Sequence, residues 1–222
     1  MLSSIKMYEL KTALQRKLIT EKFLGEIGIP FIEHLPTIEE ESETVLRTAQ
    51  EIAERIIILS YLCYIGEVEE DKLDVVKYLK KEKLWDSVTP IEKKQFLTTS
   101  KFEQQELINI SWKAECIWIL LWTIKKIEVL EMPTDEIQIE DFIELLPDFM
   151  ETTKHFIETS QLRYKSEILD QSDLLYRLHW AAKNDKSHEL SINRSIIQER
   201  HYAINWVTCY ENLNWDEITV DT

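Results

Sequence analysis

The apolar and polar positions of this chain predict helices over most of its length, and one of these helices is apolar on every side. Its apolar stretch covers residues 116–124. We expect the helix to begin at a capping box of Ser100 and Glu103 and to continue to about Leu130, before Pro133. A helix without a polar face belongs in a protein core. The pattern therefore predicts a buried central helix.

Capping residues mark two further helix starts. Thr37 and Glu40 form a capping box that predicts a helix running to Gly66. Thr89 precedes a proline, which is favoured at the first helical position because its missing N–H is not needed there. Shorter segments are expected around residues 139–146 and 149–157.

The last third of the chain is expected to form a helical hairpin. Its arms are predicted over residues 166–183 and 193–210, joined by a loop over residues 184–192. Residues 215–221 alternate apolar and polar positions, which is typical of a short extended tail.

Composition supports this all-helical reading. Three glycines and five prolines in 222 residues are too few for the regular turns of a sandwich or barrel, whereas 44% hydrophobic residues can bury a sizeable core. The prediction is an all-α, single-domain helical bundle over residues 1–222. The helix and loop of residues 1–35 belong either to its core or to its periphery.

The chain is strongly acidic, with a formal net charge of −15. A field of this sign repels phosphate backbones and anionic lipids, so neither nucleic acid nor membrane is an expected partner, and a basic protein is favoured. Residues 128–158 contain ten acidic side chains and only one basic residue, Lys154. Basic side chains gather in the first helix and over residues 77–94. The acidic stretch is either a solvated face or a docking surface.

The cysteines Cys63, Cys116 and Cys209 are widely spaced, and no Cys-x-x-Cys indicates a disulfide framework or thiolate zinc site. The Glu-x-x-His and His-Glu-x-x-His patterns are absent too, so no metal or other cofactor is expected. The first fourteen residues resemble no signal peptide, and the longest apolar runs are about half of what a bilayer requires. A cytoplasmic location is expected.

Charged side chains of the hairpin and the central helix form the first candidate site. Glu115 lies on an apolar stripe, where a carboxylate needs a cationic partner or a shifted pKa. A symmetric hairpin places Arg177 opposite Arg200. Asp173 then reaches Arg200 and Glu199 reaches Arg177, and Glu115 completes the network.

This cluster has two interpretations. It is either a buried salt-bridge lattice that fixes the docking of the hairpin, or an acid/base site of an enzyme. The candidate catalytic residues are Glu115, Asp173, Arg177, His179, Glu199, Arg200, His201 and Asn205.

Tryptophans form the second candidate site. The chain has seven, and they are either bulky core residues or the walls of a binding groove, where aromatic side chains are enriched. The candidate groove residues are Trp112, Trp122, Trp180 and Trp206.

Several blocks of the sequence are similar to a known family. They are RTAQEIAER (47–55), SWKAECIWILLW (111–122), EILDQSDLLYRLHW (167–180), ERHYAINW (199–206) and WDEITVDT (215–222). From about Gly28 onward the chain resembles a bacterial family without an assigned activity, the domain-of-unknown-function family 4272. The resemblance implies a shared pattern that contains Glu115, Asp170, Asp173, Arg177, His179, Glu199, Arg200, Asn205 and Asp216.

Three functions follow from these observations. The leading hypothesis is a cytoplasmic protein-binding module, of an immunity or regulatory type, whose acidic surface or tryptophan groove engages another protein. The first alternative is a hydrolase-like enzyme that uses the charged cluster. The second alternative is a structural homo-oligomer closed over exposed tryptophans.

Overall fold

In the computed structural model, residues 11–185 and 190–222 are described, and within them the chain folds into helices without strands. Short 3-10 turns lie between several of the helices. The α-helices are α1 (Ala13–Glu26), α2 (Ala49–Glu67), α3 (Lys72–Lys81), α4 (Pro90–Leu97), α5 (Gln104–Ser111), α6 (Lys113–Thr123), α7 (Lys154–Thr159), α8 (Lys165–Asn184) and α9 (Arg194–Val207). The predicted all-α, single-domain fold is confirmed.

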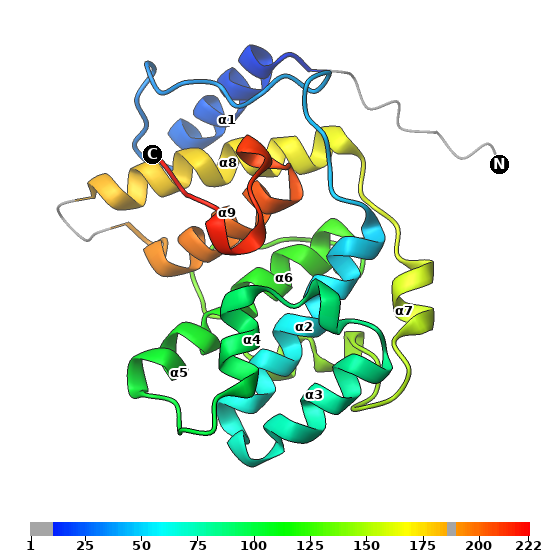
Figure 1. The fold of residues 1–222 in the computed structure, drawn as a ribbon. Helices are drawn as coiled ribbons and strands as arrows, with labels where there is room; N and C mark the ends of the chain where they lie inside the picture. The colour runs from blue at the N-terminus through cyan, green and yellow to red at the C-terminus, as the bar shows by residue number, and fades with distance from the viewer. Residues whose placement is uncertain (1–10, 186–189) are drawn as a thin grey trace.

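The helices are arranged around α6, which packs between α2 on one side and α9 on the other (Figure 1). Helix α8 packs on α9, and α1 packs on the far side of α8. The side chains of Cys116, Ile117, Ile119, Leu120 and Leu121 are fully buried. The predicted buried central helix is therefore confirmed.

The central helix is shorter than predicted. The predicted capping box of Ser100 and Glu103 is wrong, because Glu103 itself is the N-cap of α5 and its N–H donates to Glu106. Trp112 separates α5 from α6, and its N–H bonds to the carbonyls of Ile108 and Ile110. Helix α6 ends at Thr123 because Lys125 adopts a left-handed conformation with φ of 62°. The N–H groups of Lys125 and Lys126 then bond back to Trp122 and Leu121, as in a Schellman motif.

The predicted helix start at Thr37 is wrong. Helix α2 begins at Ala49, and its capping box is formed by Thr48 and Glu51. Residues 27–48 are not helical. The carboxylate of Glu40 instead accepts a hydrogen bond from the N–H of Ala13, at the start of α1. The predicted helix start at Thr89 is confirmed: Pro90 is the first residue of α4, and Thr89 and Glu92 form a capping box.

The second half of the chain follows the prediction more closely. The hairpin consists of α8 and α9, and four residues of its predicted loop, 186–189, lie outside the described residues. The segment around residues 139–146 forms two 3-10 turns, Ile139–Asp141 and Ile143–Leu145, and α7 is limited to six residues.

The tail after α9 lies against that helix. The predicted extended segment begins with a 3-10 turn, Trp215–Glu217, and continues without regular structure. The ring of Trp215 packs edge-on against Tyr202 and Trp206, and the Asn205 amide donates to the carbonyl of Thr219. Among the described helices, none is both long enough and apolar enough to cross a membrane.

Candidate functional site

The predicted pairing of Glu115 with an arginine of the hairpin is present. Glu115 of α6 accepts from the Arg200 Nε of α9 at 2.9 Å, and the two side chains are 2% exposed. The other Glu115 oxygen accepts from the N–H of Ile137, and Arg200 Nη1 donates to the carbonyl of Glu131. The pair therefore joins α6, α9 and the acidic stretch of residues 128–158, called the acidic segment from here on, in the interior.

Arg177 belongs to a separate arrangement. It donates twice to Asp173, one turn earlier on α8, at 2.9 and 3.0 Å. It also donates to Glu21 of α1 at 3.3 Å and to the carbonyl of Pro36. Asp173 and Arg177 are almost fully buried. Arg177 thus faces α1, whereas Arg200 faces α6.

The predicted four-member network is therefore wrong in its connections. Asp173 does not pair with Arg200 in the described structure, and Glu199 pairs with Lys113 at 2.7 Å instead of Arg177. The reason is that the two hairpin arginines point to different neighbouring helices. The cysteine of α6 also contacts Glu199, and burial raises the pKa of the Cys116 thiol well above its usual value.

The predicted histidines meet across the hairpin. The Nδ1 atoms of His179 and His201 lie 3.1 Å apart, and both side chains are buried. Burial lowers the pKa of His179 to about 4 and that of His201 to about 3. His201 and Asn205 also border a cavity beside α8 and α9. Within residues 11–185 and 190–222, no cluster of three or more His, Cys, Asp or Glu side chains is placed to hold a metal ion.

The four groove candidates have different surroundings. Trp122 and Trp206 are buried, while Trp112 and Trp180 are partly buried. The Arg163 guanidinium lies over Trp122, and the ring of Trp206 contacts Trp215 and Arg47. Their role as a binding groove stays a prediction.

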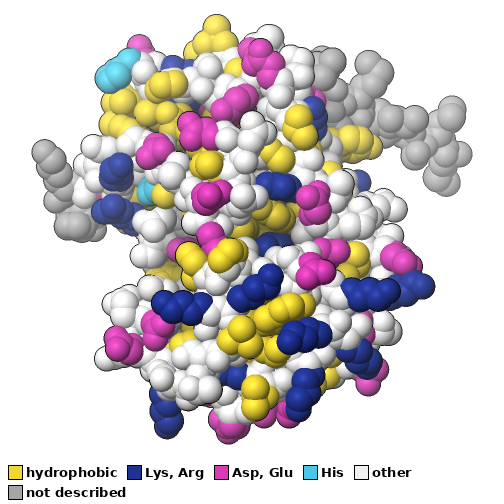
Figure 2. All heavy atoms as spheres, viewed as in Figure 1, with side chains coloured by type: hydrophobic (Ala, Val, Ile, Leu, Met, Phe, Trp, Pro, Cys, Tyr) yellow, Lys and Arg dark blue, Asp and Glu magenta, His cyan; other side chains and the backbone are white. Residues whose placement is uncertain are grey.

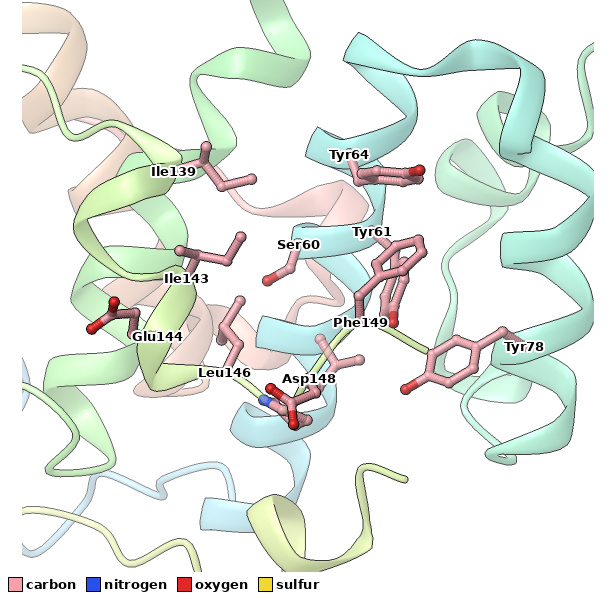
Figure 3. A pocket seen from close by; sticks show the side chains of 12 residues that line it. Ser60, Tyr61, Tyr64, Tyr78, Ile139, Ile143, Glu144, Leu146, Asp148 and Phe149 are labelled. Atoms are coloured by element: carbon pink, nitrogen blue, oxygen red, sulfur yellow. The ribbon is translucent and has the colours of Figure 1, made fainter. Parts of the chain in front are cut away.

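An apolar hollow lies elsewhere on the molecule, between α2 and the acidic segment. It has a volume of about 320 Å³. Ile139, Ile143 and Leu146 face Ser60 and Tyr61 of α2 across it (Figure 3). It was not predicted, because its walls come from segments that only the fold brings together.

Hydrogen bonds fix the edge of this hollow. Tyr61 Oη accepts from the N–H of Met150 at 2.8 Å, and Tyr78 Oη donates to the carbonyl of Glu151 at 2.7 Å. Burial raises the pKa of both tyrosines, so they remain neutral hydrogen-bonding groups at neutral pH. The chain that follows Phe149 is thereby fastened to α2 and α3.

Two apolar side chains at the hollow face solvent. Ile143 and Phe149 are each 54% exposed. The Phe149 ring stacks at 4.7 Å from Tyr64 and 5.8 Å from Tyr61, measured between ring centroids. Exposed apolar side chains beside a preformed hollow are characteristic of a contact surface.

The charge around the hollow is negative. The exposed carboxylates of Glu144 and Asp148 border it, and neither forms an ion pair with any described residue. Lysine and arginine side chains gather instead over α3 and α4, on the face that Figure 2 shows, where Lys80 and Lys93 flank Trp85. The hollow therefore combines an apolar interior with an unneutralised acidic rim.

Comparison with known proteins identifies a family but no activity. A model of the family described as Domain of unknown function (DUF4272) matches residues 16–218. No match was found among curated proteins or among solved structures.

Proposed function

The chain belongs to that family, whose description names no activity, and we propose from the geometry of the chain itself that it is a protein-binding module. In this proposal, a basic segment of a partner inserts a bulky apolar side chain into the hollow between α2 and the acidic segment. Lysine or arginine residues beside that side chain contact Glu144 and Asp148.

The proposal is supported most by one observation: exposed apolar side chains lie next to carboxylates that form no ion pair. Ile143 and Phe149 leave more than half of their surface in water beside an apolar hollow of about 320 Å³. A hollow of this size has room for a bulky side chain, and anchors of this kind supply most of the energy of many interfaces. Hydrogen bonds from Met150 to Tyr61 and from Tyr78 to Glu151 hold the chain at its edge in place.

Charge decides which partner fits. Lysine or arginine beside the anchor would neutralise Glu144 and Asp148, and the net charge of −15 speeds the approach of a basic partner. A regulatory or immunity-type inhibitor of a basic target is the form of binding that this charge favours. The charged residues of the hydrolase alternative, Glu115 with Arg200 and Asp173 with Arg177, are buried in ion pairs, so binding is the better-supported function.

Short labelled peptides test the proposal directly. Each carries a central Leu, Phe or Trp flanked by lysines, and fluorescence anisotropy measures binding to the full chain. We expect saturable binding that weakens as salt rises. The Ile143→Ser/Phe149→Ser double variant is expected to weaken it about tenfold, or about 1.4 kcal/mol.

The matched control is Leu73→Ser/Leu97→Ser, which changes two apolar side chains of similar exposure on α3 and α4. It should bind the peptides as the wild type does. Equal binding by the Ile143/Phe149 variant would show that the hollow is not the site. Light scattering measures whether the free protein is a dimer. If it is, and the Ile143→Ser/Phe149→Ser variant is a monomer, a second copy of the chain occupies the hollow instead of a peptide.

A further inference from the structure

A second cavity lies on the other side of the central helix, between the hairpin and the chain that precedes α2. It is bordered by residues 35–39, by α8 and α9, and by the end of the tail, and has a volume of about 520 Å³. It shares no lining residue with the apolar hollow, so what it binds is independent of the proposed protein contact.

The interior wall of this cavity carries polar side chains with unused hydrogen-bonding capacity. Ser172, His201 and Asn205 are 5%, 3% and 6% exposed. Ser172 Oγ has no hydrogen-bond partner among the described residues, and Asn205 uses its Nδ2 on the carbonyl of Thr219 but not its Oδ1. His201 uses Nδ1 on His179, which leaves Nε2.

These free atoms are not sealed in the protein. The buried polar atoms that lack both a partner and contact with solvent are on Arg16, Arg55, Trp118 and Thr222, for the described part of the chain. Ser172, His201 and Asn205 are not among them, so their unpaired atoms reach the space of the cavity that they line. Buried polar groups normally have partners, and three that converge on one cavity indicate a ligand that supplies them.

The outer wall is acidic and aromatic. Glu39 and Asp221 are exposed at the cavity, and the rings of Tyr176 and Tyr210 also border it. Burial, together with the carboxylates of Glu211, Asp221 and Glu39, raises the pKa of Tyr210. Aromatic faces and carboxylates both attract organic cations.

The basic residue at this wall has a partner of its own. Lys183 donates to the carbonyl of Thr222 at 3.0 Å. His201 is held neutral by burial and adds no positive charge at neutral pH. Lys183 keeps its positive charge, so two carboxylates and one ammonium line the cavity. This leaves a formal charge of −1 (two negative, one positive), which disfavours an anion.

We propose that the cavity between α8, α9 and residues 35–39 binds a small organic cation, a primary amine or a guanidinium compound. Its charge lies between Glu39 and Asp221, its apolar part contacts Tyr176 and Tyr210, and its N–H groups donate to Ser172 Oγ and Asn205 Oδ1. The ligand selects the tautomer in which His201 carries its proton on Nδ1 and accepts at Nε2.

Isothermal titration calorimetry with putrescine and agmatine tests this proposal, at about 0.15 M salt to screen the general attraction of an acidic protein for cations. The matched ligands are 1,4-butanediol, which lacks the charge, and glutarate, which reverses it. We expect saturable binding of at least one of the two cations and none of the two matched ligands.

Two double variants locate the site. Glu39→Gln/Asp221→Asn is expected to weaken cation binding at least tenfold. Glu33→Gln/Glu43→Gln removes the same charge from exposed positions outside the cavity lining and should leave binding unchanged. Failure of both cations to bind, equal binding of the diol or glutarate, or equal loss in both double variants would each overturn the proposal. None of these results bears on peptide binding at the apolar hollow.

Discussion

His179 of α8 and His201 of α9 face each other with their Nδ1 atoms 3.1 Å apart and their rings edge-on. Two nitrogens at this distance form a hydrogen bond only if one carries a proton and the other offers its lone pair. The accepting histidine must therefore be unprotonated at Nδ1, and the bond joins the two arms of the hairpin. A proton on that nitrogen would replace the bond with repulsion.

Stability is therefore expected to fall in mild acid. Burial, with Lys183 and Arg194 nearby, lowers the pKa of His179 to about 4, and burial lowers that of His201 to about 3. An unfolded histidine titrates near 6.5, so below that pH the unfolded state binds more protons than the folded state. Each histidine costs about 1.4 kcal/mol per pH unit from about 6.5 down to its folded pKa. Urea unfolding between pH 7.5 and 4.5 measures the slope.

The double variant His179→Gln/His201→Gln separates this effect from that of the carboxylates. It should be less stable than the wild type at pH 7.5 but lose less stability on acidification. His155→Gln, at an exposed position, should keep the wild-type slope. Identical slopes in all three proteins would exclude the histidine pair as the source.

The buried ion pairs predict an order of destabilisation. Glu115→Gln leaves Arg200 charged and buried without a carboxylate. Asp173→Asn removes the nearer carboxylate of Arg177, which keeps Glu21 at 3.3 Å. Breaking a buried pair costs about 3–5 kcal/mol. Glu199→Gln should cost clearly less, because the side chains of Glu199 and Lys113 are 17% and 23% exposed.

Urea midpoints of the three variants give the comparison. We expect Glu115→Gln to be the most destabilising, followed by Asp173→Asn and then Glu199→Gln. If Glu115→Gln were as mild as Glu199→Gln, the joint of α6 and α9 would not depend on this carboxylate. A structural role for the cluster would then lose its main support.

The start of α2 provides a third prediction. Thr48→Ala removes the side chain that caps the N–H of Glu51 and should cost about 1 kcal/mol. Thr37 is also followed by a glutamate three residues later, but no helix begins there. Thr37→Ala should therefore cost almost nothing. Thermal unfolding of the two variants distinguishes the two helix starts, and equal losses would favour a helical turn at Thr37.

The same pair of threonines shows what sequence could and could not predict. The capping-box spacing occurs at both Thr37 and Thr48, so local pattern alone does not select one of them. Selection comes from tertiary structure, because Glu40 is drawn to the N–H of Ala13 at the start of α1. By contrast, the buried central helix and the hairpin were predictable, since their apolar and polar patterns extend over many residues.

In the candidate sites, the sequence predicted two kinds of contact: an ion pair within one helix, and a cationic partner for a carboxylate on an apolar helix face. The Asp173–Arg177 pair follows from its four-residue spacing, and a cation for Glu115 follows from its apolar stripe. The partners of Arg177 on α1 and of Glu199 on α6 depend on how the helices rotate in the bundle. The end of α6 at Lys125 carried no signal either, because glycine is the usual residue at such a position.

Replacing either of two helical glycines by alanine should change the stability of the protein in opposite directions, because their surroundings differ. A Cβ at Gly25 in α1 would lie 3.5 Å from the Phe31 ring, an ordinary contact, whereas a Cβ at Gly66 in α2 would lie 2.9 Å from Ile110 Cγ2. Alanine gains about 1 kcal/mol over glycine inside a helix. Gly25 is the next-to-last residue of α1, so Gly25→Ala should stabilise the protein by less, about 0.5 kcal/mol.

At Gly66 the same gain is opposed by a clash. Overpacking costs about 1–3 kcal/mol, and the branched Ile110 side chain from α5 has little freedom to move. Gly66→Ala should thus be destabilising, at least about 1 kcal/mol below Gly25→Ala, in denaturant titrations. Ile110→Ala opens the contact, so Gly66→Ala should be stabilising in that background. A stabilising Gly66→Ala in the wild type would mean that α2 and α5 do not approach this closely.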